Sequence, residues 1–203
     1  MTDNPSMGRP SEFDRETVLR KAASVFWAKG YAATSTEELV SAMGIGRQSI
    51  YNAFGDKWRL YLEALTDYQQ GSTSAHIRRL QGPASAVQGI QDMFDGLVDD
   101  DDAVRALGCM GVGSACEFGA TEPQLSDLRA KASAHLRDKL VKRVREGRAA
   151  GQLDTQLNVQ QTADFLLMTM TGIQLAARSG AKAADLRRLG RFAVERIKAS
   201  PSL

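Results

Sequence analysis

Polar side chains of the kinds that read nucleic acid are concentrated in one short segment of the chain, namely Arg47, Gln48, Ser49, Tyr51 and Asn52. Arginine and glutamine can make paired hydrogen bonds to the edges of guanine and adenine, respectively. A tyrosine hydroxyl can reach a phosphate oxygen. Residues 43–55 contain no Asp or Glu, so no carboxylate in this segment would repel a phosphate backbone. The segment is therefore a candidate for contact with double-stranded DNA.

Two short helices joined by a glycine-containing turn are predicted to hold this segment. Ser35 stands three residues before Glu38, which is the capping-box spacing of a helix start, and residues 44–46 (Gly-Ile-Gly) break that helix. A second helix follows over about residues 47–53. Short helix, turn, short helix is the helix-turn-helix arrangement, here residues 35–54. In DNA-binding proteins its second helix enters the major groove, which would turn the polar segment toward base edges.

Thr36 and Lys57 are two further candidates for phosphate contact. Each stands at the N-terminal end of an expected helix, where unpaired backbone N–H groups and the helix dipole attract anions. Leu39, Met43 and Ile50 supply the apolar face that would pack the two short helices together. The predicted DNA-contact residues are Thr36, Arg47, Gln48, Ser49, Tyr51, Asn52 and Lys57.

Helical periodicity runs through the whole chain, and no alternating strand pattern of useful length is present. The opening helix, for example, places Val18, Ala22 and Phe26 on one apolar stripe. The predicted fold class is all-α, with about nine helices. They are expected at about residues 15–29, 35–43, 47–53, 56–80, 84–98, 103–118, 123–150, 159–177 and 183–198.

Composition and charge limit the class of protein. The 203 residues carry 26 Lys and Arg against 24 Asp and Glu, a net charge of +2 that is too small to indicate a nucleic-acid partner by itself. No run of 18 apolar residues predicts a membrane-spanning helix, and residues 1–10 lack the apolar region of a secretory signal, so we expect a cytoplasmic protein. With two histidines and no catalytic triad, phosphate loop or metal-ligand spacing, we expect neither an enzyme nor a bound cofactor or metal.

Residues 13–65 as a whole resemble the DNA-binding domain of the TetR/AcrR family of transcription regulators, over about a quarter of the chain. Residues 8–14 (GRPSEFD) are similar to many members as well. One departure is Gly46, because many members have Ser or Thr directly before the recognition helix and a side-chain cap is absent here. The matching segments are Lys29-Gly30-Tyr31, Thr34 to Leu39, Ala42-Met43-Gly44-Ile45, and Ser49 to Lys57.

The resemblance implies a division of the chain into three parts. Residues 1–11 would form a flexible arm, in which Arg9 either enters a minor groove or belongs to a plain tail. Residues 12–72 would form the helix-turn-helix domain, and residues 73–203 a helical ligand-binding and dimerisation domain. The implied function is a homodimer that binds a palindromic operator as a repressor and is released by a small-molecule effector. The sequence leaves repression or activation open.

The expected ligand pocket lies in the C-terminal part of the chain, where large apolar residues serve either as pocket lining or as core. Residues 107–118 contain three glycines, each costing a helix about 1 kcal/mol relative to alanine, which indicates close helix packing or room for a ligand. The candidate pocket residues are Met93, Phe94, Cys109, Met110, Phe118, Phe165, Met168 and Met170.

Cys109 and Cys116 allow two interpretations. Seven residues apart on one helix, they would lie about 10.5 Å apart along its axis and could not form a disulfide with one another. Each is either the reactive thiol of an electrophile- or redox-sensing regulator or a small buried apolar side chain. The run of four Asp at residues 99–102 is expected to be a solvated loop or a helix start, and not a cation site.

The last two expected helices carry more apolar surface than a monomer would expose, which predicts that they pair across a two-fold axis as a four-helix bundle. The alternative class is a helical interaction protein whose helix-turn-helix no longer binds DNA. Arg47, Tyr51 and Lys57 argue against that alternative, and salt-sensitive DNA binding would exclude it.

Overall fold

The computed structural model describes residues 13–199, which form helices and no β-strand apart from an isolated bridge between Leu153 and Lys198. The all-α prediction is therefore confirmed. The helices fall into two compact units, one ending at Ala64 and the other beginning at Leu65. The expected arm over residues 1–11, with Arg9, lies outside the described residues.

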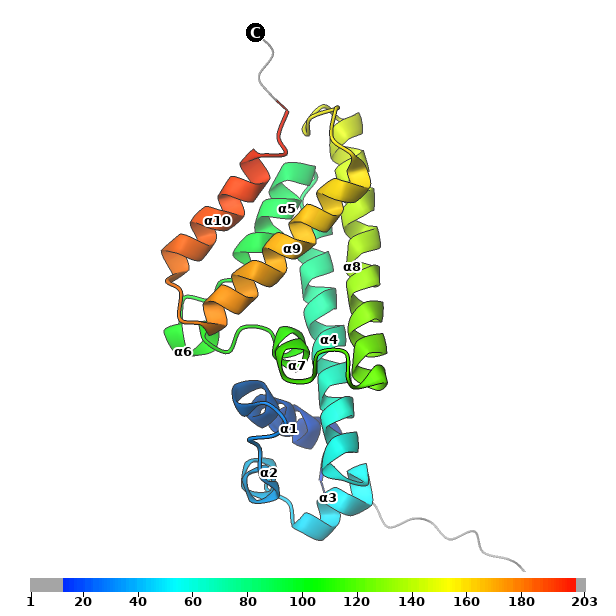
Figure 1. The fold of residues 1–203 in the computed structure, drawn as a ribbon, viewed down its shortest axis with the longest axis vertical. Helices are drawn as coiled ribbons and strands as arrows, with labels where there is room; N and C mark the ends of the chain where they lie inside the picture. Colours follow the sequence, from blue (N-terminus) through cyan, green and yellow to red (C-terminus); the bar gives the residue numbers. More distant parts are fainter. Residues whose placement is uncertain (1–12, 200–203) are drawn as a thin grey trace, which may run out of the picture. The chain divides into compact units, whose positions relative to one another are not determined.

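The first unit contains α1 (Arg15–Lys29), α2 (Thr36–Met43), α3 (Arg47–Phe54) and the start of α4 (Lys57–Gln81) (Figure 1). Its core is aromatic: the Phe26 and Tyr61 rings meet edge to face, with centroids 5.1 Å apart. Arg15 fixes α1 to its neighbours, since it pairs with Glu63 and its guanidinium lies 4.6 Å from the centroid of the Phe54 ring. The three predicted helices of this unit are thus held as one packed body.

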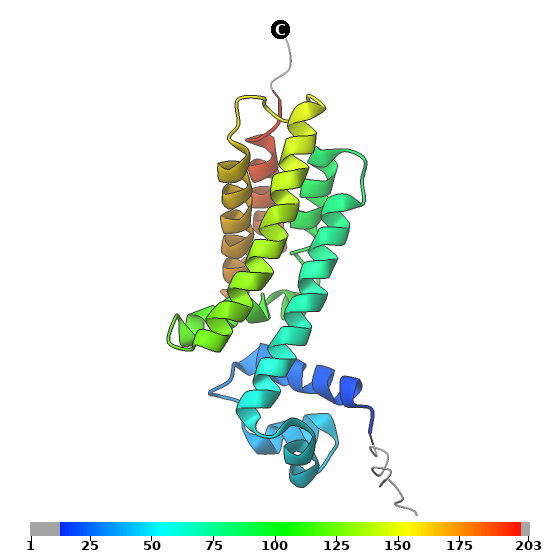
Figure 2. The same ribbon diagram turned by 90° about the vertical axis from the view of Figure 1, so that its right-hand side faces the viewer.

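The second unit contains the rest of α4 and six further helices. Helix α8 packs against α9 and α5, while α10 packs against α5 and α9 (Figures 1 and 2). The core of this unit includes Ile90, Phe94 and Ile173, all nearly or fully inaccessible to solvent. The further helices are α5 (Ala86–Asp95), α6 (Asp102–Arg105), α7 (Met110–Phe118), α8 (Pro123–Ala149), α9 (Val159–Arg178) and α10 (Ala183–Glu195).

The helix expected over residues 103–118 is wrong, because two helices occupy that stretch. The one-turn α6 ends near Ala106, and α7 begins at Met110 with Cys109 as its N-cap. Between them Gly108 has φ of +61°, a left-handed conformation that ends a helix and that glycine adopts without strain. This break accounts for ten helices in the described residues where about nine were expected.

Most other expected boundaries agree with the structure to within a residue or two. The exceptions are α5, which covers only the middle of the expected 84–98 helix, and α10, which ends three residues before Lys198. Helix α6 begins within the four-Asp run, where the Asp101 carboxylate accepts hydrogen bonds from the N–H groups of Ala103 and Val104. This run is therefore a helix start, which is one of the two structures that its sequence predicts.

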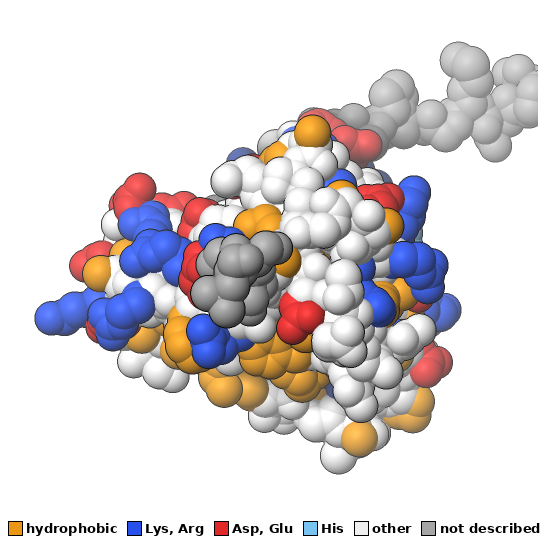
Figure 3. Space-filling view, turned by 90° about the horizontal axis from the view of Figure 1, so that it is seen from above, with side chains coloured by type: hydrophobic (Ala, Val, Ile, Leu, Met, Phe, Trp, Pro, Cys, Tyr) orange, Lys and Arg blue, Asp and Glu red, His pale blue; other side chains and the backbone are white. Residues whose placement is uncertain are grey.

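Surface charge is mixed. Figure 3 shows Lys and Arg side chains interspersed with Asp and Glu on one face of the molecule, with apolar side chains between them. This agrees with the small net charge of +2. Within the described residues, no helix has the length and hydropathy that crossing a lipid bilayer requires.

Candidate functional site

Helices α2 and α3 form the predicted helix-turn-helix. Helix α2 starts at a complete capping box, in which the Ser35 hydroxyl accepts from the Glu38 N–H and the Glu38 carboxylate accepts from the Ser35 N–H. Gly44 then turns the chain with φ of +72°, and its N–H donates to the carbonyl of Val40. Gly46 precedes α3 without any side-chain cap, as the sequence indicates. The turn chemistry therefore follows the pattern that predicted it.

The two faces of α3 differ sharply. Ile50 and Phe54 are buried on the inner face. Of the predicted DNA-contact residues on α3, four are exposed and Ser49 is half-buried; the exposed four are Arg47, Gln48, Tyr51 and Asn52. The structure thus brings these side chains together on one helix whose opposite face is fixed by packing.

The exposed polar side chains of α3 are hydrogen-bonded among themselves and to α2. Gln48 Nε2 donates to Asn52 Oδ1 over 2.9 Å, one helical turn away. Arg47 forms an ion pair with Glu37 of α2. Exposed pairs of this kind contribute at most about 1 kcal/mol, so they orient the side chains without locking them.

The helix starts at Thr36 and Lys57 offer donors to an anion. The capping box uses the N–H groups of Ser35 and Glu38, which leaves those of residues 36 and 37 at the positive end of α2. The ammonium of Lys57 lies 4.2 Å from the centroid of the Tyr31 ring, a cation–π contact that holds it half-buried.

Glu38 is the most electrostatically perturbed carboxylate of the first unit. It pairs with Lys29 and accepts from the Ser35 N–H. The hydrogen bond from Lys29 is the larger cause and that from the Ser35 backbone the second, and together they lower the pKa of Glu38 to about 2. The carboxylate is therefore ionised whenever the protein is folded near neutral pH, and it fixes the start of α2 to the end of α1.

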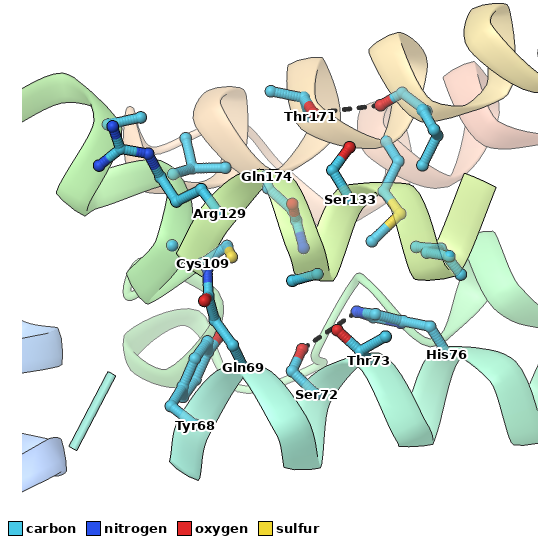
Figure 4. A pocket seen from close by; sticks show the side chains of 17 residues that line it. Tyr68, Gln69, Ser72, Thr73, His76, Cys109, Arg129, Ser133, Thr171 and Gln174 are labelled. Atoms are coloured by element: carbon cyan, nitrogen blue, oxygen red, sulfur yellow. Dashed lines mark hydrogen bonds between the residues drawn. The ribbon is translucent and has the colours of Figure 1, made fainter. Parts of the chain in front are cut away.

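The second unit contains a cavity of about 240 Å³ bordered by α4, α7, α8 and α9. Figure 4 shows its side chains: Gln69, Ser72 and His76 rise from α4, and Thr171 and Gln174 face them from α9. Apolar lining comes from Leu136, Leu167 and Met170 among others. The cavity is thus amphipathic, with a polar wall on α4.

Two buried polar atoms on this wall have no hydrogen-bond partner among residues 13–199. They are Oε1 of Gln69 and Nδ1 of His76. The other ring nitrogen of His76 lies 3.2 Å from the Ser72 hydroxyl. Burial, with a smaller contribution from the charge of Arg79, lowers the pKa of His76 to about 4, so the ring is uncharged at neutral pH. An unpaired buried polar atom costs about 1–3 kcal/mol, which marks this wall as incomplete.

Two further residues border the cavity. Arg129 donates to the hydroxyls of Ser114 and Ser126, each over 3.2 Å, and to the carbonyl of Gly119. Burial raises the pKa of Tyr68, as does the negative charge that Cys109 would carry when ionised. The phenol is therefore neutral near neutral pH, and it lies near the Cys109 thiol.

Of the candidate pocket residues from the sequence, Cys109 and Met170 line the cavity. Met93, Phe94 and Met110 are buried without lining it, Phe118 is half-buried, and Phe165 and Met168 are 43% and 68% exposed on α9.

The polar wall of the cavity on α4 is absent from the sequence-based expectations. Its sequence signal is a stripe of Gln69, Ser72, Thr73 and His76 at helical spacing, which is indistinguishable from a solvent-facing stripe until the partner helices are placed.

The two cysteines are both free thiols, Cys109 half-buried and Cys116 exposed. Because Cys109 caps α7, only Cys116 lies within the helix, which corrects the expectation that one continuous helix contains both. Within the described residues, no three His, Cys, Asp or Glu side chains gather as a metal ion would require.

Comparison with known proteins identifies both units. Residues 18–64 match the sequence model described as "Bacterial regulatory proteins, tetR family". Residues 86–192 match the model described as "Tetracyclin repressor-like, C-terminal domain". The two matches together cover the helix-turn-helix and the helices α7, α8 and α9, which border the cavity opposite α4.

Full-length relatives agree with these matches. The chain is 32% identical over 185 residues to the uncharacterized HTH-type transcriptional regulator YezE of Bacillus subtilis, covering 90% of this chain and 94% of that one. It is 26% identical to the HTH-type transcriptional repressor ComR of Escherichia coli, covering 98% and 94%. A solved structure of the TetR-family regulator CifR, a cysteine mutant complexed with 26-bp operator DNA, superposes with a TM-score of 0.79 at 26% identity, covering 94% of this chain and 100% of that one. This chain belongs to the TetR family of bacterial transcriptional regulators.

Proposed function

We propose that this TetR-family regulator is a cytoplasmic repressor that binds a palindromic operator in double-stranded DNA as a homodimer and is released by a small molecule. The observation that carries the proposal is the two-faced α3, with Ile50 and Phe54 buried and Arg47, Gln48, Tyr51 and Asn52 exposed. An exposed row of hydrogen-bonding side chains on a rigid helix is what reading a major groove requires. CifR, which has a similar fold, was solved with operator DNA.

The DNA-contact residues divide into two roles. Arg47 and Gln48 suit base edges, because each can make two hydrogen bonds to one base. Tyr51 and Lys57 suit phosphate oxygens, and Thr36 brings the N-terminal amides of α2 to a phosphate. Ser49 and Asn52 complete the predicted contact set, with Asn52 already held by Gln48.

The last two helices, α9 and α10, are the proposed dimer interface. Five of the seven large apolar side chains that are strongly exposed in the described residues lie on them: Phe165, Met168, Leu175, Leu189 and Phe192. Apolar surface collected on two adjacent helices favours pairing with a second copy, because a four-helix bundle would bury it. In the proposed division, residues 12–72 form the DNA-binding head and residues 73–203 the effector and dimer domain, and the shared helix α4 contributes Gln69 and Ser72 of the head to the cavity.

Helix α4 provides the physical link between effector and operator. It is continuous from Lys57 to Gln81, its first turns belong to the first unit, and its later turns carry Gln69 and His76 of the cavity. A ligand that favours one position of α4 biases the spacing of the two recognition helices in a dimer. Linkage then requires ligand and operator to weaken each other's binding by the same factor.

Selection of bound duplexes from a random DNA pool tests the proposal. The full-length dimer is expected to enrich a palindrome whose half-sites are about one helical turn apart. The Arg47→Ala/Tyr51→Ala variant is expected to bind that operator at least tenfold more weakly, because a good bidentate base contact is worth about 1–3 kcal/mol. An Arg20→Ala variant removes an exposed guanidinium of α1 outside this face and serves as the matched control.

The outcome decides between classes of protein. A folded dimer that enriches no sequence at low salt would indicate the alternative, a helical interaction protein whose helix-turn-helix does not bind DNA. An affinity for the selected operator that falls steeply with added salt would exclude that alternative, because it shows release of counterions from phosphates.

A thiol-sensing version of the regulator is favoured by one observation, the position of Cys109 on the cavity wall beside Tyr68. Alkylation with N-ethylmaleimide, followed by peptide mass spectrometry and operator binding, tests it. Thiol sensing predicts loss of operator binding in the parent and its retention in Cys109→Ser. Equal loss in Cys109→Ser and parent, with protection only in Cys116→Ser, would assign the effect to the exposed thiol instead.

A further inference from the structure

The polar wall of the cavity is built around an amide with unused hydrogen-bonding capacity. Gln69 is 9% exposed, and its Oε1 has no hydrogen-bond partner within the described part of the chain. Its Nε2 lies 2.9 Å from the place that a Cβ at Gly111 would occupy, so the absence of a side chain at Gly111 makes room for the amide. Since an amide can present oxygen or nitrogen after a half-turn, Gln69 can offer a donor and an acceptor side by side.

Formal charge is scarce on the cavity lining. No Asp or Glu of the described part of the chain lines it, and His76 is neutral at physiological pH because burial lowers its pKa to about 4. Arg129 is the one Lys or Arg among the lining residues that the structure describes, and its guanidinium is hydrogen-bonded to three neutral oxygens. In Figure 4 the guanidinium turns away from Gln69 and His76. An ionised ligand would therefore lose its hydration without gaining a counter-charge at the α4 wall, which is costly.

The volume and apolar lining of the cavity limit the size and character of a ligand. A dry apolar cavity of about 150 Å³ admits benzene. The present cavity of about 240 Å³ admits a somewhat larger molecule, on the order of ten non-hydrogen atoms. Leu136, Leu167 and Met170 offer an apolar surface for its body.

We propose that the cavity takes a compact uncharged molecule with a hydrogen-bond donor and acceptor side by side, as in a carboxamide, and an apolar body, with Gln69 as the residue that recognises the polar end. The proposal rests on the proposed function in treating the cavity as the effector site. It adds the chemical class of the effector. A carboxamide fits because it can form two parallel hydrogen bonds with the Gln69 amide and satisfy its buried oxygen.

Three probes of nearly equal shape test the charge class: benzamide, benzoate and benzamidinium. Binding to the full-length protein is measured by isothermal titration calorimetry at pH 7.5 in the absence of DNA. Benzamide is expected to bind saturably and at least tenfold more tightly than either ion. Equal or tighter binding of an ion would overturn the uncharged class, and no saturable binding of any probe would overturn the proposed size and polarity.

Two leucine variants separate recognition from folding. Gln69→Leu keeps the approximate size and is expected to weaken benzamide at least tenfold, while raising the Tm of the free protein by about 2–4 °C because an unpaired buried oxygen is removed. Gln70→Leu makes the same chemical change at an exposed neighbour that does not line this cavity and is expected to leave benzamide affinity unchanged. Unaltered benzamide affinity in Gln69→Leu would show that Gln69 does not recognise the polar end of the ligand.

The probe-binding experiments and the operator selection can contradict their proposals independently of one another. Probe binding is read without DNA, so a protein that enriches no operator can still bind benzamide with the predicted preference. A protein that enriches an operator and binds no probe would keep the repressor function and lose this effector class.

Discussion

At the scale of single residues, the side chains that we propose to read DNA are oriented by weak contacts, which binding to DNA can replace. Arg47 pairs with Glu37, and Gln48 holds Asn52, all on exposed surface. Such contacts contribute little to stability, whereas a bidentate contact with a base contributes about 1–3 kcal/mol to discrimination. The exchange therefore favours DNA, and the free protein presents these side chains already close to a single helix face.

Glu38 gives the first unit a specific acid sensitivity. Its pKa is about 2 in the folded protein, mainly because of Lys29, against an ordinary value of 4.5. A carboxylate whose pKa falls on folding stabilises the folded state fully above pH 4.5, and this contribution disappears as the pH falls toward 2. We predict that Glu38→Gln flattens the loss of stability between pH 4.5 and 2, measured as the urea midpoint at each pH.

The contribution of Glu38 is separable from general acid unfolding. Lys29→Met removes the cation that is the larger cause of the shift and should flatten the same pH window. The double variant should behave like Glu38→Gln, because loss of the carboxylate removes both causes of the shift, whereas Lys29→Met leaves the smaller effect of the Ser35 backbone. If the urea midpoint falls as steeply between pH 4.5 and 2 in Glu38→Gln as in the parent, Glu38 is not the source of this acid sensitivity.

The two candidate sites differ in how far the sequence can predict them. The exposed face of α3 could be predicted because its residues lie within one short helix, where spacing alone fixes which side chains share a face. The cavity draws on four helices, and which polar stripes face one another depends on how those helices pack. The sequence favours large apolar residues such as Phe94 as lining, but Phe94 is buried in the core. The polar wall of the cavity is formed by Gln69 and His76 instead.

At the scale of helices, caps and glycines predicted most boundaries. Asp14 accepts from the Glu16 N–H at the start of α1, and the capping box at Ser35 starts α2, both within sequence patterns of a few residues. The break at Gly108 was missed because a glycine in an apolar run reads equally well as a close contact within a helix. In the structure Gly108 has a positive φ, and Gln174 and Arg178 of α9 pack against it.

Gly108 should therefore be intolerant of any side chain. A Cβ there would lie 2.8 Å from the carbonyl oxygen of Gln174 and 3.0 Å from the Cβ of Arg178, in addition to the strain of a positive φ. We predict that Gly108→Ala lowers the free energy of unfolding by about 1–3 kcal/mol, measured by urea denaturation.

Gly113 provides the matched control within α7. Its φ is negative, and the nearest atoms to an added Cβ belong to the Arg178 guanidinium at 3.9 Å. Gly113→Ala should raise stability by about 0.5–1 kcal/mol, because alanine is the better helix former. Equal effects of the two substitutions, in either direction, would show that the break between α6 and α7 does not depend on the conformation of Gly108.

At the scale of the whole molecule, α9 and α10 carry an apolar face that remains exposed to solvent in a single chain. Met168 is 68% exposed and Phe192 57% exposed, which is unusual for side chains of this size. A protein–protein interface of ordinary size buries about 1,600 Å² in total, and two adjacent helices per copy can supply that area. We predict that Met168→Glu/Phe192→Glu converts a dimer into a folded monomer of 22.0 kDa, measured by light scattering after gel filtration.

The same substitutions connect assembly to operator binding. A dimer joins two recognition helices, so the second half-site is bound at a high effective concentration, and this gain is lost in a monomer. The double variant should therefore bind a single half-site as well as the parent does, while losing most of its affinity for the palindrome. Val104→Glu places the same charge on an apolar side chain that is 43% exposed on α6, and it should leave both mass and palindrome affinity unchanged. If the double variant stays dimeric and binds the palindrome normally, the pairing surface lies elsewhere on the second unit.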